Sequence, residues 1–152
     1  MAVQVELKRI IITETSDQQV IYLKEVDGEG AKSGGSASPG TGGSGGGGGG
    51  RSFPIVIGST EALAIDRRLK GMPTPRPQTH ELLSNVIEKL DARLERILIN
   101  DLQDHTFYAK LVIRHNGKSV EVDSRPSDAI ALGVANNVPI FVAEHVLDEV
   151  GG

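Results

Sequence analysis

Two short segments of this sequence gather the side chains that phosphate chemistry needs. The first is Asp123-Ser124-Arg125-Pro126-Ser127-Asp128, in which an arginine lies between two carboxylates. The second is Thr79-His80-Glu81, which follows a proline-rich segment over residues 72–78. Hydrolysis of a phosphodiester requires an activated water, positive charge beside the phosphate oxygens and a proton for the leaving oxygen. Carboxylates that hold divalent metals, or histidine together with arginine, commonly provide these functions.

The Asp123–Asp128 segment is predicted to lie where a strand ends and a helix begins. This placement makes Asp123 and Asp128 candidate catalytic residues and candidate ligands for Mg²⁺ or Mn²⁺, with Arg125 as a phosphate ligand. A structural alternative stays open, because an acidic residue in the first turn of a helix is favoured by the helix dipole alone. Arg125 could equally form an ion pair with Asp128, three residues further along the helix.

His80 is the third candidate catalytic residue, since it begins a predicted helix beside an acid. Its alternative is an ordinary hydrogen-bonded histidine near the surface. Upstream, four positive charges fall within ten residues, and this local density favours phosphate contact even in an acidic chain. Three of them are candidate phosphate ligands: Arg67, Arg68 and Arg76. Arg67 and Arg68 could instead form the solvent-exposed face of their helix.

The elements that must position these residues can be predicted from hydrophobic periodicity and turn residues. Strands are expected over 3–12, 19–26, 53–57, 94–102, 106–114, 119–123 and 140–142. Ser59 or Thr60 is predicted to cap a helix that ends near Gly71, and Thr79 is predicted to cap a second helix. That second helix carries an apolar stripe at helical spacing: Leu82, Leu83, Val86, Ile87 and Leu90. A third helix is expected to begin near Pro126, with a short helix or turn over 144–150. Asn116-Gly117 predicts a tight hairpin, because both residue types tolerate positive φ. Strands that come in hairpin runs indicate an α+β domain with a mainly antiparallel or mixed sheet and three main helices.

Glycine is concentrated in one stretch of the chain. Of 19 glycines, 13 fall between Gly28 and Gly50. We therefore expect a single domain over residues 1–150 that is interrupted by a flexible Gly/Ser-rich insert at 27–52. The string Gly40-Thr41-Gly42-Gly43-Ser44-Gly45 matches a dinucleotide-binding pattern. Such a site needs a strand before it and a helix after it, and neither is predicted here.

The remaining totals exclude several classes of protein. The chain has no cysteine, which rules out disulfide frameworks, thiolate metal sites and cysteine nucleophiles. The net charge of −4 rules out a strongly basic nucleic-acid-binding coat. The amino terminus is unlike a signal peptide and no apolar run reaches membrane-spanning length, so we expect a cytoplasmic protein with no membrane partner.

Two separated motifs are similar to the bifunctional nuclease domain family. The first comprises Ile55-Val56-Ile57-Gly58, Glu61-Ala62, Pro75-Arg76-Pro77 and Thr79-His80. The second runs from Asp123 to Leu132 and is followed by Pro139 to Glu144. The sequence departs from the family pattern at Glu81, where aspartate is common, at Gly133, where alanine is usual, and in the glycine insert. A glycine inside a helix costs about 1 kcal/mol relative to alanine, so we expect close packing at Gly133.

The resemblance implies an α+β fold, a homodimer and a nuclease that acts on both DNA and RNA. All five aromatic residues fall on apolar strands, so the aromatic interleaving typical of single-strand stacking platforms is missing. Sequence-specific readout is therefore not expected. Two other functions remain open: a binding or regulatory module without catalysis, and a dimeric scaffold.

Overall fold

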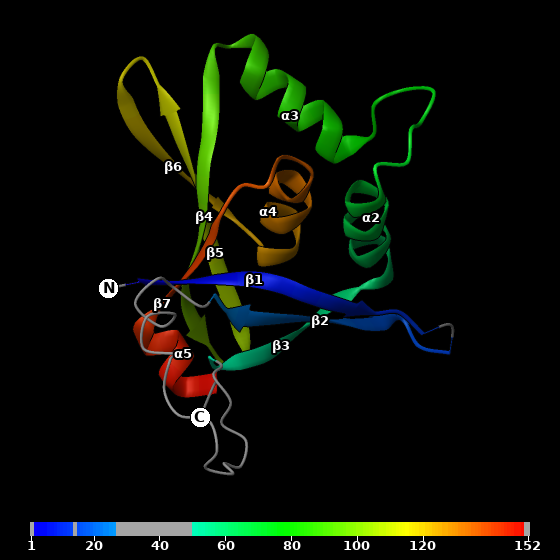
Figure 1. Cartoon of the computed structure of the whole chain (residues 1–152), viewed down its shortest axis with the longest axis vertical. Coiled ribbons are helices and arrows are strands. Elements are labelled where there is room, and N and C mark those ends of the chain that lie inside the picture. The colour runs from blue at the N-terminus through cyan, green and yellow to red at the C-terminus, as the bar shows by residue number, and fades with distance from the viewer. Residues whose placement is uncertain (1, 14, 27–49, 151–152) are drawn as a thin grey trace, which may run out of the picture.

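A seven-stranded sheet organises the protein in a computed structural model that describes residues 2–13, 15–26 and 50–150. The strands lie in the order β3-β2-β1-β7-β4-β5-β6. Their bounds are β1 Ala2–Ile11, β2 Gln18–Glu25, β3 Ser52–Gly58, β4 Ala92–Gln103, β5 Thr106–His115, β6 Lys118–Ser124 and β7 Ile140–Ala143. Figure 1 shows β1–β3 running crosswise to β4, so the sheet is strongly twisted.

The predicted hairpins are confirmed. β1 and β2 pair antiparallel, and so do β5 and β6. Asn116 and Gly117, which join β5 to β6, both have positive φ, at 54° and 76°. β3 pairs antiparallel with β2, so the two ends of the predicted glycine insert meet: the Glu25 N–H donates to the Arg51 carbonyl at 2.9 Å. Most of the insert lies outside the described residues.

β7 holds the two halves of the sheet together. It pairs antiparallel with β1 and parallel with β4, although it comes almost last in the chain. Hairpin signals report only neighbours in sequence, so this placement could not be read from them. The result is a mixed sheet in an α+β domain, as the sequence predicts.

The helices are α2 Ser59–Lys70, α3 Thr79–Lys89, α4 Pro126–Gly133 and α5 Glu144–Val150, with a 3₁₀ turn η1 over Val134–Asn136. Figure 1 shows α4 lying between the sheet and the pair α2 and α3, while α5 lies beside β7. Two predicted caps are wrong by one residue. The N-cap of α2 is Gly58, and that of α3 is Gln78, whose N–H donates to the Glu81 carboxylate at 2.9 Å. Among the described residues, no helix is long and apolar enough to cross a membrane.

α4 is the buried helix of the core. Seven of its eight residues are buried, and Ile130 is completely inaccessible to solvent. Gly133 packs closely, as the sequence predicts, because a β-carbon there would lie 2.8 Å from Cδ1 of Ile97 and 3.0 Å from Cβ of Val138. α4 is therefore locked in position by its neighbours.

α3 has the opposite environment, since none of its residues is buried. Its predicted apolar stripe exists, but most of it faces solvent, including Leu82, Leu83, Val86 and Leu90. Of the stripe, Ile87 packs against the core from a half-buried position. α3 thus presents an apolar face that the described part of the chain does not cover.

Candidate functional site

The first turn of α4 positions the two charged residues at the centre of the site. β6 ends at Ser124, and Arg125 is the N-cap of α4 with extended backbone angles (φ −75°, ψ 147°). Pro126 occupies the first turn, where its fixed φ suits a helix and its missing N–H removes no helical hydrogen bond. Asp128 follows within the same turn, so the side chains of Arg125 and Asp128 project from one end of a buried helix.

Asp128 lies between two basic side chains. Its Oδ1 is 3.0 Å from Nε2 of His80, and its Oδ2 accepts a hydrogen bond of 2.8 Å from Nε of Arg125. His80 comes from the first turn of α3, and its side chain is 16% exposed. Residues 48 positions apart in the sequence therefore meet across the junction of α3 and α4.

Glu61 extends this arrangement on the other side of Arg125. Its Oε2 is 3.0 Å from a terminal guanidinium nitrogen of Arg125. Glu61, Arg125, Asp128 and His80 thus form a row of acidic and basic groups, which we call the ionic chain. The Arg125 side chain remains 64% exposed despite its two carboxylate partners, so one side of the guanidinium faces solvent.

The electrostatics of the site favour the charged forms of Asp128 and Arg125. Burial raises the pKa of the Asp128 carboxyl, but hydrogen bonds and positive charge from Arg125 and His80 outweigh burial and bring that pKa below its ordinary value of 3.8. The pKa of Arg125 is raised, first by its hydrogen bond to Asp128 and also by the charges of Asp128 and Glu61. An ionised Asp128 and a charged Arg125 are the stable states near neutral pH.

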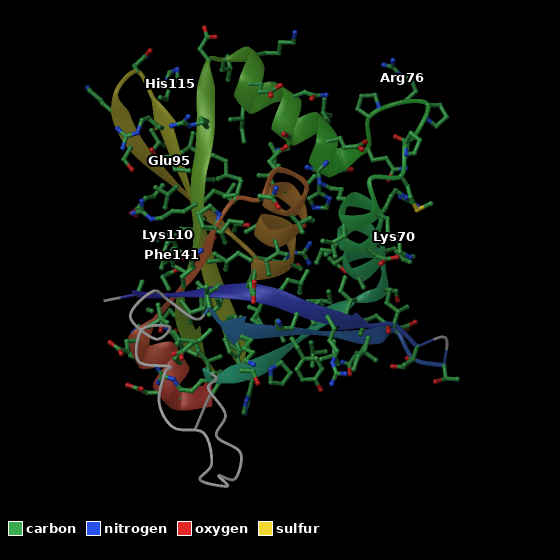
Figure 2. The ribbon with its side chains drawn as sticks, viewed as in Figure 1. Lys70, Arg76, Glu95, Lys110, His115 and Phe141 are labelled. Atoms are coloured by element: carbon green, nitrogen blue, oxygen red, sulfur yellow. The ribbon has the colours of Figure 1, made fainter. Side chains whose placement is uncertain are left out.

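The other sequence-predicted residues lie elsewhere. Asp123 is exposed on β6 opposite Lys110, and its carboxylate forms no hydrogen bond or ion pair with the described residues. Arg76 lies on the connection between α2 and α3 and points away from the body of the protein (Figure 2). Arg67 donates to the Gln78 side chain at 2.6 Å.

Arg68 has a structural partner at the opposite end of α4 from the ionic chain. Its guanidinium donates to the carbonyl oxygens of Ala131 and Leu132, the latter at 3.0 Å. Burial lowers the pKa of Arg68, and the charge of Glu81 acts in the opposite direction. These bonds satisfy helix-terminal carbonyls that lack partners within α4. Phosphate contact by Arg67, Arg68 and Arg76 stays a prediction.

The donor set at Asp128 does not fit a divalent metal. Both of its carboxylate oxygens face basic nitrogens, whereas a metal ligand must direct an oxygen lone pair at the ion. Within the described ranges, no three histidine or acidic side chains are grouped so that they could hold a metal ion. The exposed guanidinium of Arg125 suits an anion instead.

An open groove of about 770 Å³ begins at Arg125 and Glu61. Its walls are residues 54–58 of β3, residues 105–107 at the start of β5 and residues 125–127 at the start of α4. Gln18, Leu102 and Val150 complete the lining. This volume lies within the range of small-molecule sites.

Sequence reasoning missed Glu61 and the groove. Glu61 belongs to the first family motif, which was the available signal, but an acid in the first turn of α2 is expected from the helix dipole alone, so its residue type indicated no chemical role. The groove exists because β3 and β5 approach each other. The rings of Phe53 and Phe107 stack at this approach, with their centroids 5.8 Å apart. That approach joins residues far apart in the sequence, and local patterns cannot reveal it.

Comparisons with known proteins show the family of the chain. A family model described as the bifunctional nuclease domain matches residues 46–152, which include every member of the ionic chain. An uncharacterized protein of Mycobacterium tuberculosis strain H37Rv is 34% identical over 148 residues, covering 97% of this chain and 76% of its own. Bifunctional nuclease 1 of Oryza sativa subsp. japonica is 23% identical over 97 residues, covering 62% of this chain and 29% of the rice protein. The chain belongs to the bifunctional nuclease domain family.

Proposed function

We propose that this protein is a nuclease that hydrolyses phosphodiester bonds of DNA and RNA with little sequence preference. The observation that carries the proposal is the contact of His80 and Arg125 with one carboxylate, Asp128. Family membership supports nucleic acid as the substrate, since rice relatives carry the name bifunctional nuclease. The ionic chain offers an anion-binding cation beside a proton-transfer group, which is the minimum that phosphodiester hydrolysis needs.

In this proposal Arg125 binds the scissile phosphate through the exposed side of its guanidinium and neutralises the charge that develops on the phosphate oxygens. Glu61 and Asp128 hold the guanidinium in place. Asp128 accepts a hydrogen bond from Nε2–H of His80, which leaves Nδ1 as the ring nitrogen that receives a proton. Nδ1 has no hydrogen-bond partner among the described residues.

The reaction balances in two proton transfers. Water attacks phosphorus while Nδ1 of His80 accepts its proton, and the bond from phosphorus to the leaving oxygen breaks. The protonated His80, stabilised by the charge of Asp128, then returns the proton to the leaving oxygen or to solvent. The products are a phosphate monoester and a hydroxyl.

The test measures cleavage of a fluorescent single-stranded DNA and of its RNA counterpart. His80→Gln and Asp128→Asn should each lower kcat by about 10²-fold or more, as expected for loss of a general acid–base group. His115→Gln, on the far hairpin, is the matched control and should leave kcat unchanged. If the unaltered protein cleaves neither substrate, with or without Mg²⁺, Mn²⁺ or Ca²⁺, the nuclease proposal fails and a non-catalytic binding module takes its place.

Metal dependence is tested in the same assay. The sequence predicts Mg²⁺ or Mn²⁺ held by Asp123 and Asp128, whereas the mechanism above uses neither ion. Activity that persists in EDTA supports the His80 and Arg125 mechanism. Activity that disappears in EDTA and in Asp123→Asn supports the metal site predicted from the sequence.

As a second proposal, the protein forms a homodimer through α3. A dimer is also what the alternative function, a dimeric scaffold, requires. The exposed Leu82, Leu83, Val86 and Leu90 form an apolar face of the kind that protein interfaces cover. Sedimentation equilibrium should give a dimer for the unaltered chain and a monomer for Leu83→Glu. Leu63→Glu, at an exposed leucine of α2, is the control and should remain dimeric. A monomeric unaltered chain overturns this proposal.

A further inference from the structure

The groove beside the ionic chain lies between two free strand edges. Among the described residues, β3 is the last strand on its side of the sheet and pairs with β2 alone. On the other side, β5 pairs with β6 only from Ala109 onward, so residues 106–108 have no partner strand there within the described part of the chain. The groove therefore exposes backbone N–H and C=O groups from both walls, which can bond to the edges of a planar polar ligand.

The lining of the groove is largely apolar and partly aromatic. Ile55, Val56, Leu102 and Phe107 contribute to it. Val56 is 58% exposed, although it lies in the middle of a strand. An apolar lining with hydrogen-bonding edges suits a flat heteroaromatic ring, because the ring faces are apolar and its perimeter carries donors and acceptors.

Charge is placed where β3 ends. Arg125, with an exposed guanidinium, is paired with Glu61, and the Glu61 carboxylate lies beside Gly58, the last residue of β3. A ligand that fits must carry an anion at one end and an apolar ring at the other. A nucleotide has this form, with its phosphate joined to its base through a sugar.

A peptide strand is the competing occupant of a free sheet edge. Pro54 opposes it, because proline lacks the N–H that strand pairing needs and is typical of protected edges. The short free stretch of β5, residues 106–108, also offers little length for strand addition.

We infer that the groove between β3 and β5 is a nucleobase subsite, which holds one unstacked base while Arg125 binds the adjoining phosphate. The inference rests on the proposed nuclease function and deepens it. A base can enter the groove only after leaving its stack, which costs least in a single strand. The substrate class is therefore single-stranded or locally unpaired nucleic acid.

Binding is measured on the full chain labelled with ¹⁵N, by titration with AMP, UMP and ribose 5-phosphate. Ribose 5-phosphate carries the same phosphate and sugar without a base. Both nucleotides should shift the amide resonances of residues 55–57 and 106–107, whereas ribose 5-phosphate should shift only those near Arg125. Val56→Gln should weaken nucleotide binding about fivefold and leave ribose 5-phosphate unaffected, because it removes apolar contact without changing charge.

Val120→Gln is the matched control. Val120 is an exposed valine on β6, the other edge strand of the sheet, and it lies outside the groove. This variant should bind AMP as the unaltered chain does. Cleavage assays add a second readout: a single strand should be cut at least about tenfold faster than the same sequence in a duplex, and Val56→Gln should reduce that preference.

The outcomes separate this inference from the proposed function. Nucleotide shifts in the groove without cleavage of any nucleic acid support the subsite and overturn the nuclease. Cleavage without groove shifts overturns the subsite and supports the nuclease. The inference is overturned if ribose 5-phosphate shifts the groove resonances as much as the nucleotides do, or if Val120→Gln weakens AMP binding as much as Val56→Gln does. A hexapeptide of alternating threonine and valine is the probe for strand addition. If only this peptide shifts the groove resonances, the inference is also overturned.

Discussion

Two helices supply the His80–Asp128 contact, and their environments are opposite. α4, which carries Asp128, has seven of eight residues buried, whereas α3, which carries His80, has none. α4 is held by β4, β5, α2 and α3, while α3 contacts the rest of the protein mainly through α4 and β4. Asp128 of the proposed catalytic pair is therefore fixed by the core, whereas His80 depends on a small set of contacts.

Because of this difference, the site has one rigidly held side and one side whose position can change. Asp128 and Arg125 cannot shift without disturbing the core, because they start a buried helix. His80 can shift with α3, whose apolar face the described residues leave uncovered. Anything that covers that face, including a second copy of the chain, would also fix His80 against Asp128.

The largest expected difference comes from the same substitution on each helix. Leu132 of α4 is 2% exposed and Leu82 of α3 is 55% exposed. Leu132→Ala should lower the free energy of unfolding by about 2–5 kcal/mol, because it leaves a cavity in the core. Leu82→Ala should lower it by less than about 0.5 kcal/mol in a monomer. Urea denaturation at low protein concentration measures both, and equal losses would contradict the comparison.

A smaller effect is expected where α2 secures the end of α4. Arg68 donates hydrogen bonds to two carbonyls of α4, and Arg68→Met should cost about 1–3 kcal/mol because it leaves those carbonyls unsatisfied. Arg67→Met is the control on the same helix. Among the described residues, the Arg67 side chain bonds only to the exposed Gln78 side chain, so its replacement should cost less than about 0.5 kcal/mol. Comparable losses in urea denaturation would mean that Arg68 has no special role in holding α4.

The pH dependence of stability tests how firmly Asp128 is held. Its pKa is lowered in the folded protein, so its ionised form stabilises the fold above the ordinary carboxyl pKa of about 3.8, and this stabilisation is lost as the pH falls through the lower folded value. The unaltered chain should therefore exceed Asp128→Asn in stability at pH 7, and the difference should shrink by pH 3. Asp123→Asn should track the unaltered chain at both values. A difference that does not change with pH would contradict the ionic role of Asp128.

The sequence revealed local features well and long-range ones poorly, for a physical reason. The Asn116-Gly117 hairpin, the Gly71 helix stop and the close packing at Gly133 depend on backbone angles or crowding that residue types report directly. Asp128, Arg125 and His80 were identified as candidates because their residue types carry the chemistry. Their grouping, and the addition of Glu61, depends on how α2, α3 and α4 pack. Hydrophobic periodicity does not encode that packing, and it predicted an apolar stripe on α3 without showing that it faces outward.

The glycine insert is the segment whose alteration should affect the core least, less than any change in α3 or α4. Glu25 and Arg51 lie at its two ends, and their side chains form an ion pair at 2.8 Å within the β2–β3 pairing. Because the ends already meet, replacing residues 34–50 with four residues leaves the connection long enough to close. Shortening it roughly by half should raise the free energy of unfolding by about 0.6 kcal/mol, because a shorter connection loses less entropy when its two ends are brought together. Cleavage rate and urea denaturation measure the outcome. A loss of activity with stability intact would place function in the glycine segment, whereas a loss of stability above about 1 kcal/mol would mean that the segment packs on the core.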